Sequence, residues 1–255
     1  MESLNFLFFT RFSVAITPTP NYLVVRELAQ KNNISNKDTV GLRKMYLEYL
    51  YSEERMAYKM KAFSNLTIPS VIANLEPFPT AKWMIYTSDE CPEIYKNELY
   101  RITSSCPQIE IVELNNGLKG ETSHWLTKVE ELKSYDSRFC TVRCDDDDAI
   151  PQGLTLNIAN TAIEQKDPFI YHCPNGDYCQ ISKEGDLVMG YPVPNYPWLL
   201  TQGLAGVDLD IRGLGNHRTI KSRFPEITVI ENLDLRYLMS CDENFTASKK
   251  VFVPK

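Results

Sequence analysis

The sequence predicts an α/β fold in which a mostly parallel central sheet is flanked by helices. Short apolar runs typical of buried strands alternate with longer segments whose apolar residues recur at helical spacing, and this alternation continues as far as Asp148. The chain has 255 residues, of which 43% are apolar and 24% charged, as expected for one globular domain. Because such sheets bind ligands at the carboxyl ends of their strands, we expect the functional site at that edge.

Five segments are expected to be strands, because each is a short run rich in apolar, aromatic or β-branched residues. The first is rich in Phe, Leu and Val, and the fourth ends directly before four consecutive aspartates. The expected strands span residues 4–16, 82–87, 108–114, 138–144 and 169–172.

Four segments have the apolar spacing of helices. The first is interrupted near residues 65–69, where Pro69 cannot donate a backbone hydrogen bond, so it predicts one long helix and a shorter one. The expected helical segments span residues 39–75, 93–105, 123–135 and 153–165.

The last third of the chain predicts many loops. Asn175-Gly176 is typical of a tight turn between short strands. Residues 190–197 contain three prolines, and residues 203–215 contain four glycines. Loops of this kind often form substrate pockets, so we expect a loop-rich C-terminal half to contribute to binding.

The charge distribution disfavours a nucleic-acid partner. The formal net charge is −6 and the basic residues are scattered, so no basic stripe exists to neutralise a phosphate backbone. The apolar run at residues 6–9 lacks the features of a signal peptide, and no apolar stretch approaches the roughly 18 residues of a spanning helix. We therefore expect a cytoplasmic protein whose contact with the inner face of the membrane, if it has one, is peripheral.

The cysteines and the absent motifs narrow the choice of chemistry. Seven cysteines form an odd set without a CxxC pair, which disfavours a disulfide framework and a structural zinc site. Cys140 and Cys144 fall in an expected strand and are interpreted as small buried hydrophobes. The sequence contains no GxxxxGK[ST], GxGxxG, GxSxG or HExxH pattern. A P-loop ATPase, a Rossmann dehydrogenase, a serine hydrolase of the GxSxG type and a zincin therefore receive no support.

The strongest functional signal is the run of four aspartates at residues 145–148, after an expected core strand and Arg143. Like charges this close repel one another, so the arrangement persists most easily where solvent or a cation offsets the repulsion. Mg²⁺ and Mn²⁺ prefer oxygen ligands and are commonly held by one or two carboxylates together with substrate phosphates. The alternatives are a solvated acidic loop, or an acidic turn favoured by the dipole of the following helix.

Three motifs resemble those of nucleotide-sugar transferases with the GT-A fold. They are Thr10-Arg11-Phe12 at the end of the first strand, the second strand with sequence WMIYTSD, and the acidic segment RCDDDDAI. Within that group, the sequence is most similar to the bacterial rhamnosyl transferases. The resemblance covers roughly residues 6–150 and extends faintly over residues 198–217. It implies a single GT-A-like domain with a nucleotide-sugar-binding half, residues 1–150, and an acceptor-binding half, residues 151–255.

The resemblance also implies roles for matching residues. The residues implied to bind the nucleotide-sugar are Thr10, Arg11, Phe12, Asp89, Arg143, Asp145 and Asp146. The implied ligands of Mn²⁺ or Mg²⁺ are Asp147, Asp148 and His217, although the spacing leaves open which of the aspartates bind. For Arg11 the alternative is a surface ion pair, and for His217 it is an ordinary hydrogen-bonded histidine.

Further candidates lie in the glycine-bordered segment 206–213 and in the proline-rich segment before it. Asp208 and Asp210 are candidates for the catalytic base if this segment is a mobile loop facing the site, and otherwise cap the loop. Trp198 and Tyr196 are candidates for the acceptor site, because sugar rings pack their apolar faces on aromatic rings; core packing is the alternative.

These features together predict a metal-dependent glycosyltransferase. It would move a hexose or deoxyhexose from a UDP-, dTDP- or GDP-linked donor to a glycan or lipid-linked glycan hydroxyl, in one inverting step. The resemblance implies a role in bacterial surface polysaccharide synthesis, such as that of lipopolysaccharide. Two other functions remain open: another metal-dependent nucleotidyl or phosphoryl enzyme, and a non-catalytic carbohydrate- or partner-binding domain with a structural Ca²⁺.

Overall fold

The computed structural model contains a seven-stranded central sheet and a separate four-stranded sheet. It describes residues 4–18, 23–35, 37–115, 118–134, 137–182, 187–193, 204–214 and 220–241. The central sheet consists of β1 (Asn5–Arg11), β2 (Lys82–Ser88), β3 (Ile109–Leu114), β4 (Phe139–Arg143), β6 (Phe169–His172), β9 (Leu204–Val207) and β10 (Thr228–Glu231). The smaller sheet consists of β5 (Asp148–Ala149), β7 (Asn175–Ile181), β8 (Leu187–Val193) and β11 (Arg236–Cys241).

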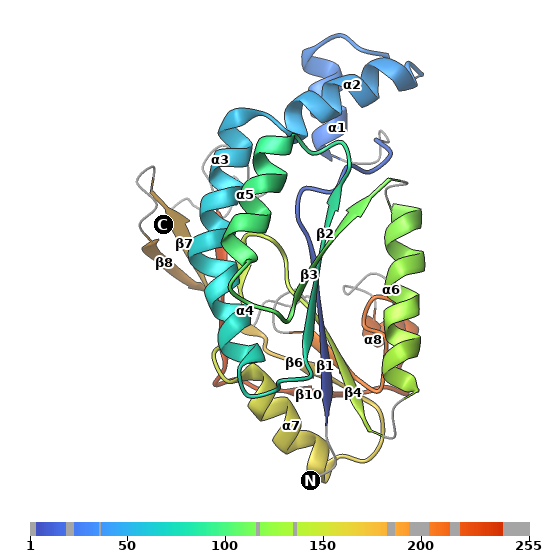
Figure 1. Cartoon of the computed structure of the whole chain (residues 1–255), viewed down its shortest axis with the longest axis vertical. Coiled ribbons are helices and arrows are strands. Elements are labelled where there is room, and N and C mark those ends of the chain that lie inside the picture. Colours follow the sequence, from blue (N-terminus) through green and yellow to red (C-terminus); the bar gives the residue numbers. More distant parts are fainter. Residues whose placement is uncertain are drawn as a thin grey trace.

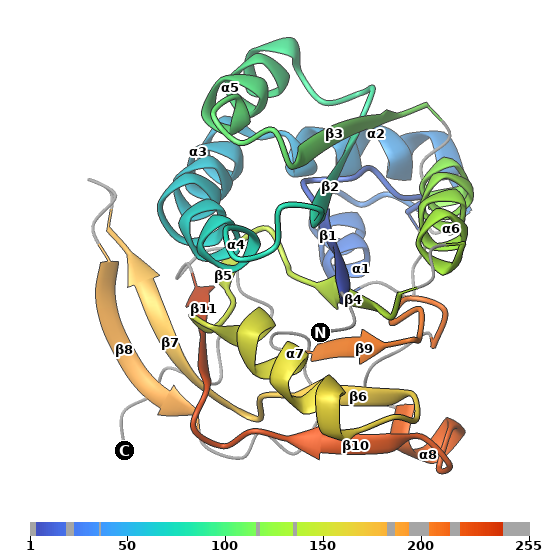
Figure 2. The same ribbon diagram turned by 60° about the horizontal axis from the view of Figure 1, so that its bottom comes forward.

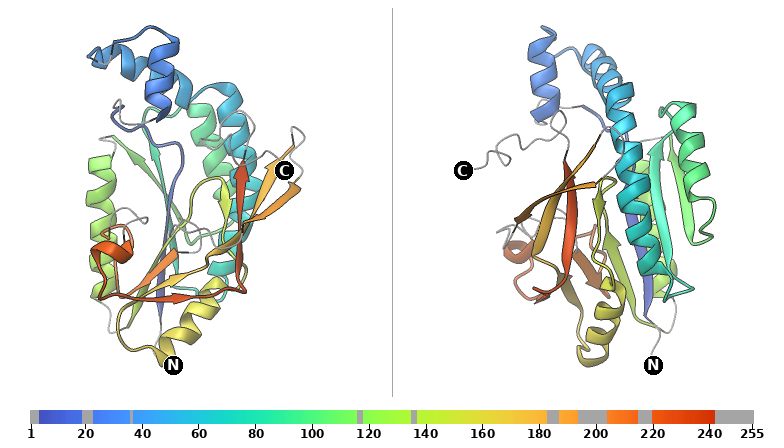
Figure 3. Two further views of the ribbon diagram at one scale, coloured as in Figure 1. Left: turned by 180° about the vertical axis from the view of Figure 1, so that it is seen from behind. Right: turned by 90° about the vertical axis from the view of Figure 1, so that its left-hand side faces the viewer.

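The central sheet is mostly parallel, as predicted. Its strand order is β10-β6-β9-β4-β1-β2-β3, and every pair is parallel except the two that involve β9. The strands β1 to β4 share one direction, so their carboxyl ends meet at a single edge. The smaller sheet, ordered β5-β11-β7-β8, lies beside α3 (Glu53–Ala62) and contacts it through β7 (Figure 3).

Helices cover both faces of the central sheet (Figures 1 and 2). One face packs against α3, η1 (Phe63–Thr67), α4 (Ile68–Leu75), α5 (Glu93–Thr103) and α7 (Leu154–Glu164). The other face packs against α6 (Leu118–Lys133) and α8 (Ile220–Arg223). A helical pair, α1 (Leu23–Lys31) and α2 (Thr39–Leu50), packs around Ala15 just beyond β1. In the described part of the chain, no helix is both long enough and apolar enough to cross a bilayer.

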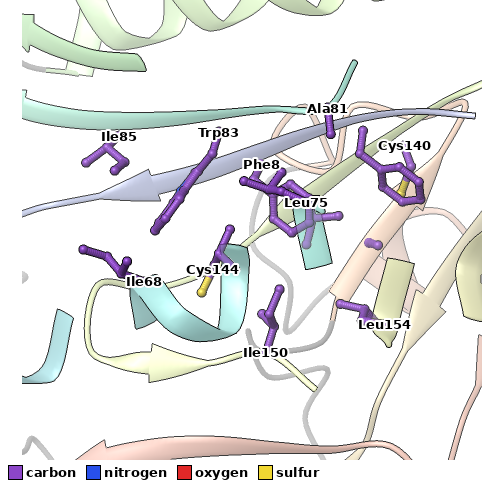
Figure 4. Close-up of a cluster of buried hydrophobic side chains, with 14 of the residues drawn as sticks. Phe8, Ile68, Leu75, Ala81, Trp83, Ile85, Cys140, Cys144, Ile150 and Leu154 are labelled. Carbon is purple, nitrogen blue, oxygen red and sulfur yellow. The ribbon is translucent and has the colours of Figure 1, made fainter. Parts of the chain in front are cut away.

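The alternation of β1 explains why the core has two sides. Phe6 and Phe8 face α3 and α4, whereas Leu7 and Phe9 face α6, and all four are almost fully buried. The larger core continues across β2 and β4, where Figure 4 shows Trp83 and Cys144 among the packed apolar side chains. Cys140 and Cys144 are buried, as predicted, and both thiols are free.

The five expected strands and the four helical segments are present, with boundaries displaced by a few residues. The segment 39–75 is divided once more than expected, because the chain leaves the helix at Tyr51 and restarts after Ser52. The interruption predicted near Pro69 is a π-turn, η1, in which the chain widens but remains helical. The helix α1 was not predicted.

Two predictions for the last third of the chain are wrong. Asn175-Gly176 is not a hairpin turn but the start of β7, where it pairs in parallel with Arg236 and Tyr237 of β11. The segment 206–213 is not a free loop at its start, because Gly206 lies in the buried strand β9 between β4 and β6. In both cases pairing with a distant strand overrides the local preference of glycine for turns.

Candidate functional site

The acidic turn, residues 145–148, lies where β4 leaves the central sheet. The amide of Cys144 still donates to the carbonyl of Phe9 on β1 at 2.9 Å, and the next residues turn away before Asp148 enters β5 of the smaller sheet. The amide of Asp148 donates to the carbonyl of Asp145 at 3.4 Å. The turn therefore joins the two sheets at the carboxyl edge.

Two of the four carboxylates share one largely buried ammonium. Lys59 Nζ on α3 donates to Asp146 Oδ1 at 2.7 Å and to Asp147 Oδ2 at 2.6 Å. The side chain of Lys59 is only 13% exposed. Burial lowers the pKa of Lys59, but the two carboxylates outweigh this effect, so the pKa lies above its ordinary value and the amine stays charged.

The other two carboxylates have different partners. Arg143 Nη2 donates to Asp145 Oδ1 at 3.0 Å, and Asp145 is the most exposed member of the turn, at 34%. Asp148 is buried and accepts a hydrogen bond from the Ser240 amide of β11 at 3.2 Å. Burial is the main cause that raises the pKa of Asp147 and, more strongly, of Asp148; neighbouring aspartates add to it and Lys59 opposes it.

The end of β1 approaches the acidic turn through its backbone. Ser13 has a φ of 48°, and its amide donates to Asp146 Oδ2 at 3.2 Å. Thr10 and Phe12, expected to line a nucleotide pocket, are fully buried: Thr10 accepts a bond from Trp83, and Phe12 packs on the ring of Phe63.

Arg11, at the end of β1, belongs to a charged network on the α6 face. Its guanidinium makes two hydrogen bonds to Glu121, at 2.7 and 2.8 Å, and Arg212 donates to the same carboxylate. Glu121 is fully buried, and the Arg212 guanidinium carbon lies 4.4 Å from the centre of the Phe9 ring. Arg11 thus forms an ion pair, the alternative to its predicted role in nucleotide binding, but its partner is interior and its own side chain remains 42% exposed.

Asp89 is exposed at the end of β2, on the same edge of the sheet.

The two candidates for the catalytic base, Asp208 and Asp210, lie away from the acidic turn. Asp208 bonds Arg138 at 2.6 Å and the Phe139 amide at 3.1 Å, which places it at the amino end of β4, opposite the acidic turn. Asp210 accepts from Trp125 Nε1 at 2.8 Å, on the α6 face.

The three remaining candidates, Tyr196, Trp198 and His217, lie outside the described residues. The structure thus brings Asp145, Asp146, Asp147 and Asp148 together with Arg11, Asp89 and Arg143 along one edge. It does not bring Asp208 to that edge.

The acidic turn as folded does not fit a divalent cation. Its carboxylates face three different partners, and the ammonium of Lys59 already contacts two of them, those of Asp146 and Asp147. Within the described ranges, no three His, Cys, Asp or Glu side chains converge as metal ligands do.

Two residues of this site were missed by the sequence analysis. Lys59 lies one helical turn from Met56 and from Phe63, both fully buried, so its position at the edge of the apolar face could have been noticed. Glu121 precedes the buried Trp125 by four residues on α6, which gives a similar signal.

The comparison with protein families agrees with the resemblance to the rhamnosyl transferases. A family model described as "Putative rhamnosyl transferase" matches residues 28–165, which include Asp89 and the acidic turn but not Thr10-Arg11-Phe12. Among curated proteins, no sequence matches. A crystal structure from Bacillus anthracis, described as a "putative glucose-1-phosphate thymidylyltransferase" in complex with a sucrose, is similar with a TM-score of 0.43 and 9% identity, over 92% of this chain and 89% of that chain.

The family match covers more than half of the 255 residues, and the sheet with its acidic turn has the architecture that the motifs predicted. The chain belongs to the rhamnosyl transferase family.

Proposed function

We propose that this protein is a glycosyltransferase that moves a deoxyhexose, such as the rhamnose named by its family, from a nucleotide-sugar to a glycan hydroxyl. One observation carries the proposal. The hydrogen bond from the Ser13 amide to Asp146 joins the end of β1 to the acidic turn after β4. This is the edge of a parallel sheet at which nucleotide ligands bind.

The charged residues at this edge suggest how the donor is held. Arg143 pairs in register with Phe9, and Arg212 covers the ring of Phe9, so both side chains lie on the α6 face with Arg11. Arg11 is 42% and Arg143 28% exposed, which leaves both within reach of a ligand. Arginine binds phosphate oxygens in a bidentate manner, so this group is suited to a diphosphate whose charge grows as the sugar leaves.

We propose a single inverting displacement. The acceptor hydroxyl attacks the anomeric carbon opposite the diphosphate, and a carboxylate takes its proton. The resemblance implies Mn²⁺ or Mg²⁺, whereas the acidic turn already holds the ammonium of Lys59, so we assign no step to a metal ion. The base roles predicted for Asp208 and Asp210 stay predictions, as do the acceptor roles of Tyr196 and Trp198. Lipid-linked or lipopolysaccharide glycans and a cytoplasmic location stay predictions as well.

The test is ligand binding followed by turnover. UDP, GDP, dTDP and their sugar conjugates are screened for an increase in the thermal unfolding midpoint, with and without Mn²⁺, because a ligand of the native state raises its stability. One nucleotide and its conjugate should do so, and the conjugate should be consumed when a glycan acceptor is added. If no member of the panel binds under either condition, the proposal is wrong.

A matched pair of variants locates the site. Asp145→Ala should abolish transfer and leave the thermal midpoint nearly unchanged, because Asp145 is half-buried and its charge partner Arg143 remains solvated. Asp167→Asn removes an exposed carboxylate after α7 and should leave turnover unchanged. Equal turnover in both variants would place the site elsewhere.

A further inference from the structure

Lys59 occupies an unusual position for a lysine. It lies on α3 with its side chain 13% exposed, and its ammonium contacts carboxylate oxygens of two consecutive residues, Asp146 at 2.7 Å and Asp147 at 2.6 Å. Lysine is rarely buried unless it is paired. Here the pairing links a helix to the acidic turn, 87 and 88 residues away in the chain.

The two aspartates are held in place from other directions as well. The second oxygen of Asp146 accepts the Ser13 amide at 3.2 Å, and the carbonyl of Asp147 accepts the Ser240 amide at 3.2 Å. The Ser240 hydroxyl is in turn 2.6 Å from the hydroxyl of Tyr58, the neighbour of Lys59 on α3. Strand ends and helix thus fix the carboxylate of Asp146 and the backbone of Asp147 beside the ammonium of Lys59, a cation of the chain.

We propose that Lys59 is the resident cation of the acidic turn, and that it takes the place of the divalent ion which the sequence motif implies. Mg²⁺ holds its oxygen ligands at about 2.0–2.1 Å, closer than the ammonium does, so it could not share the two carboxylates with Lys59. Two cations at one position would also repel each other. The turn therefore binds no divalent ion while Lys59 is in place.

The position of Lys59 has a consequence for donor binding, which rests on the proposed function. Because Lys59 occupies two carboxylates of the turn in place of a metal ion, the diphosphate of the donor is met by arginines of the chain, and donor binding is independent of metal. The role of Lys59 is to position the acidic turn, since its ammonium contacts the carboxylates and not the reacting atoms.

The experiment measures Mn²⁺ binding to the full chain without nucleotide, from the paramagnetic resonance signal of free Mn²⁺. The wild-type protein should show no saturable site. Lys59→Met keeps the length of the side chain and removes its charge, so the two carboxylates should gain one Mn²⁺ site roughly tenfold or more tighter than any wild-type binding. Mn²⁺ should also raise the thermal midpoint of this variant and not that of the wild type.

Controls keep the outcome decisive. Lys82→Met removes an exposed lysine at the start of β2 and should gain no site. If Lys59→Met does not fold, Lys59→Gln, which can still hydrogen-bond the carboxylates, is titrated instead with the same expectation. Saturable Mn²⁺ binding by the wild type, or no gain in the neutral variants, would overturn the inference. Because no nucleotide is present, either result leaves the screen for nucleotide-sugars unaffected.

Discussion

Glu121 is a buried carboxylate shared by two arginines, Arg11 and Arg212. Removing one member of a buried charged group leaves the others without a partner in a region of low dielectric, and this costs more than the pair itself contributes. The penalty is larger for Arg212 than for Arg11, because the Arg212 side chain is only 14% accessible and its Nη1 already has no hydrogen-bond partner among the described residues.

We therefore expect Glu121→Gln to lower the free energy of unfolding by about 3 kcal/mol. The measurement is urea denaturation of the variant and the wild type. Glu130→Gln, on the same helix, removes a 66% exposed carboxylate paired with Lys133 and should cost less than about 0.5 kcal/mol. Similar losses in the two variants would show that Glu121 is not a buried anchor.

We expect His172 to make the stability of the protein depend on pH. It is almost fully buried on β6, and its Nδ1 lies 3.7 Å from a Glu231 oxygen, too far for a hydrogen bond. Burial lowers the pKa of His172, Lys221 adds to this effect, and Glu231 only partly opposes it. Since the unfolded chain then binds a proton that the folded chain does not, stability is complete above the ordinary pKa of about 6.5 and falls as pH drops below it.

The variant His172→Phe should lose this dependence, because it keeps an aromatic ring and cannot be protonated. The free energy of unfolding is measured in urea at about pH 7.5 and about pH 5.5. The decrease between these two pH values should be smaller in the variant than in the wild type, by up to roughly 1 kcal/mol for each unit by which the pKa of His172 is lowered. An unchanged difference would mean that His172 does not contribute to the pH dependence.

The sequence revealed the acidic turn but not the residues that hold it. Four adjacent aspartates are visible in any reading, whereas Lys59 is 87 residues from Asp146, and Arg11 is 110 residues from Glu121. Such contacts arise only once the fold brings distant segments together. The one local sign of these contacts was the presence of apolar residues, buried in the structure, one helical turn from Lys59 on α3 and from Glu121 on α6.

Elements set by local pattern were predictable, and those set by distant pairing were not. The strands β1, β2 and β4 are nearly continuous apolar runs, as expected for strands covered on both faces, whereas the edge strand β3 alternates apolar residues with glutamates. The helices between them show helical spacing. In contrast, β9 is a four-residue strand, LAGV, with a glycine inside it. Its place between β4 and β6 supplies the pairing that its composition does not suggest.

Gly176 gives a prediction at the level of β7. It pairs with Tyr237 of β11, and a Cβ added to it would lie 2.5 Å from the Tyr237 ring, which is buried. Gly176→Ala should therefore cost about 1–3 kcal/mol through overpacking. The thermal midpoint should fall by several degrees, since 1 kcal/mol corresponds to about 2–4 °C in a chain of this size.

A double variant checks the cause. In the presence of Tyr237→Ala, which removes the ring, Gly176→Ala should cost much less than it does alone, because the two substitutions affect one contact. Additive losses would indicate that the strain lies in the backbone of β7 and not against the ring.

At the scale of the whole molecule, the two expected halves of the chain share one sheet. The strands β6, β9 and β10 follow residue 150, yet β9 pairs directly with β4, and Phe169 and Ala205 lie in the same core as Phe8. The acidic turn itself connects the central sheet to β5, which pairs with β11 near the end of the described chain. The candidate site therefore depends on segments from both halves.

We expect the protein to unfold in one cooperative transition. Two of the three tryptophans, the buried Trp83 and Trp125, lie in the first half, so fluorescence reports mainly on that half. Far-ultraviolet circular dichroism reports on the whole chain, and the two urea curves should coincide. A fragment of residues 1–150 should lack a cooperative transition, because β4 would become an open edge whose buried face, with Cys140 and Val142, is uncovered. Separate transitions in the full chain, or cooperative unfolding of the fragment, would show that the nucleotide-sugar half folds independently and that the shared sheet is not required for its stability.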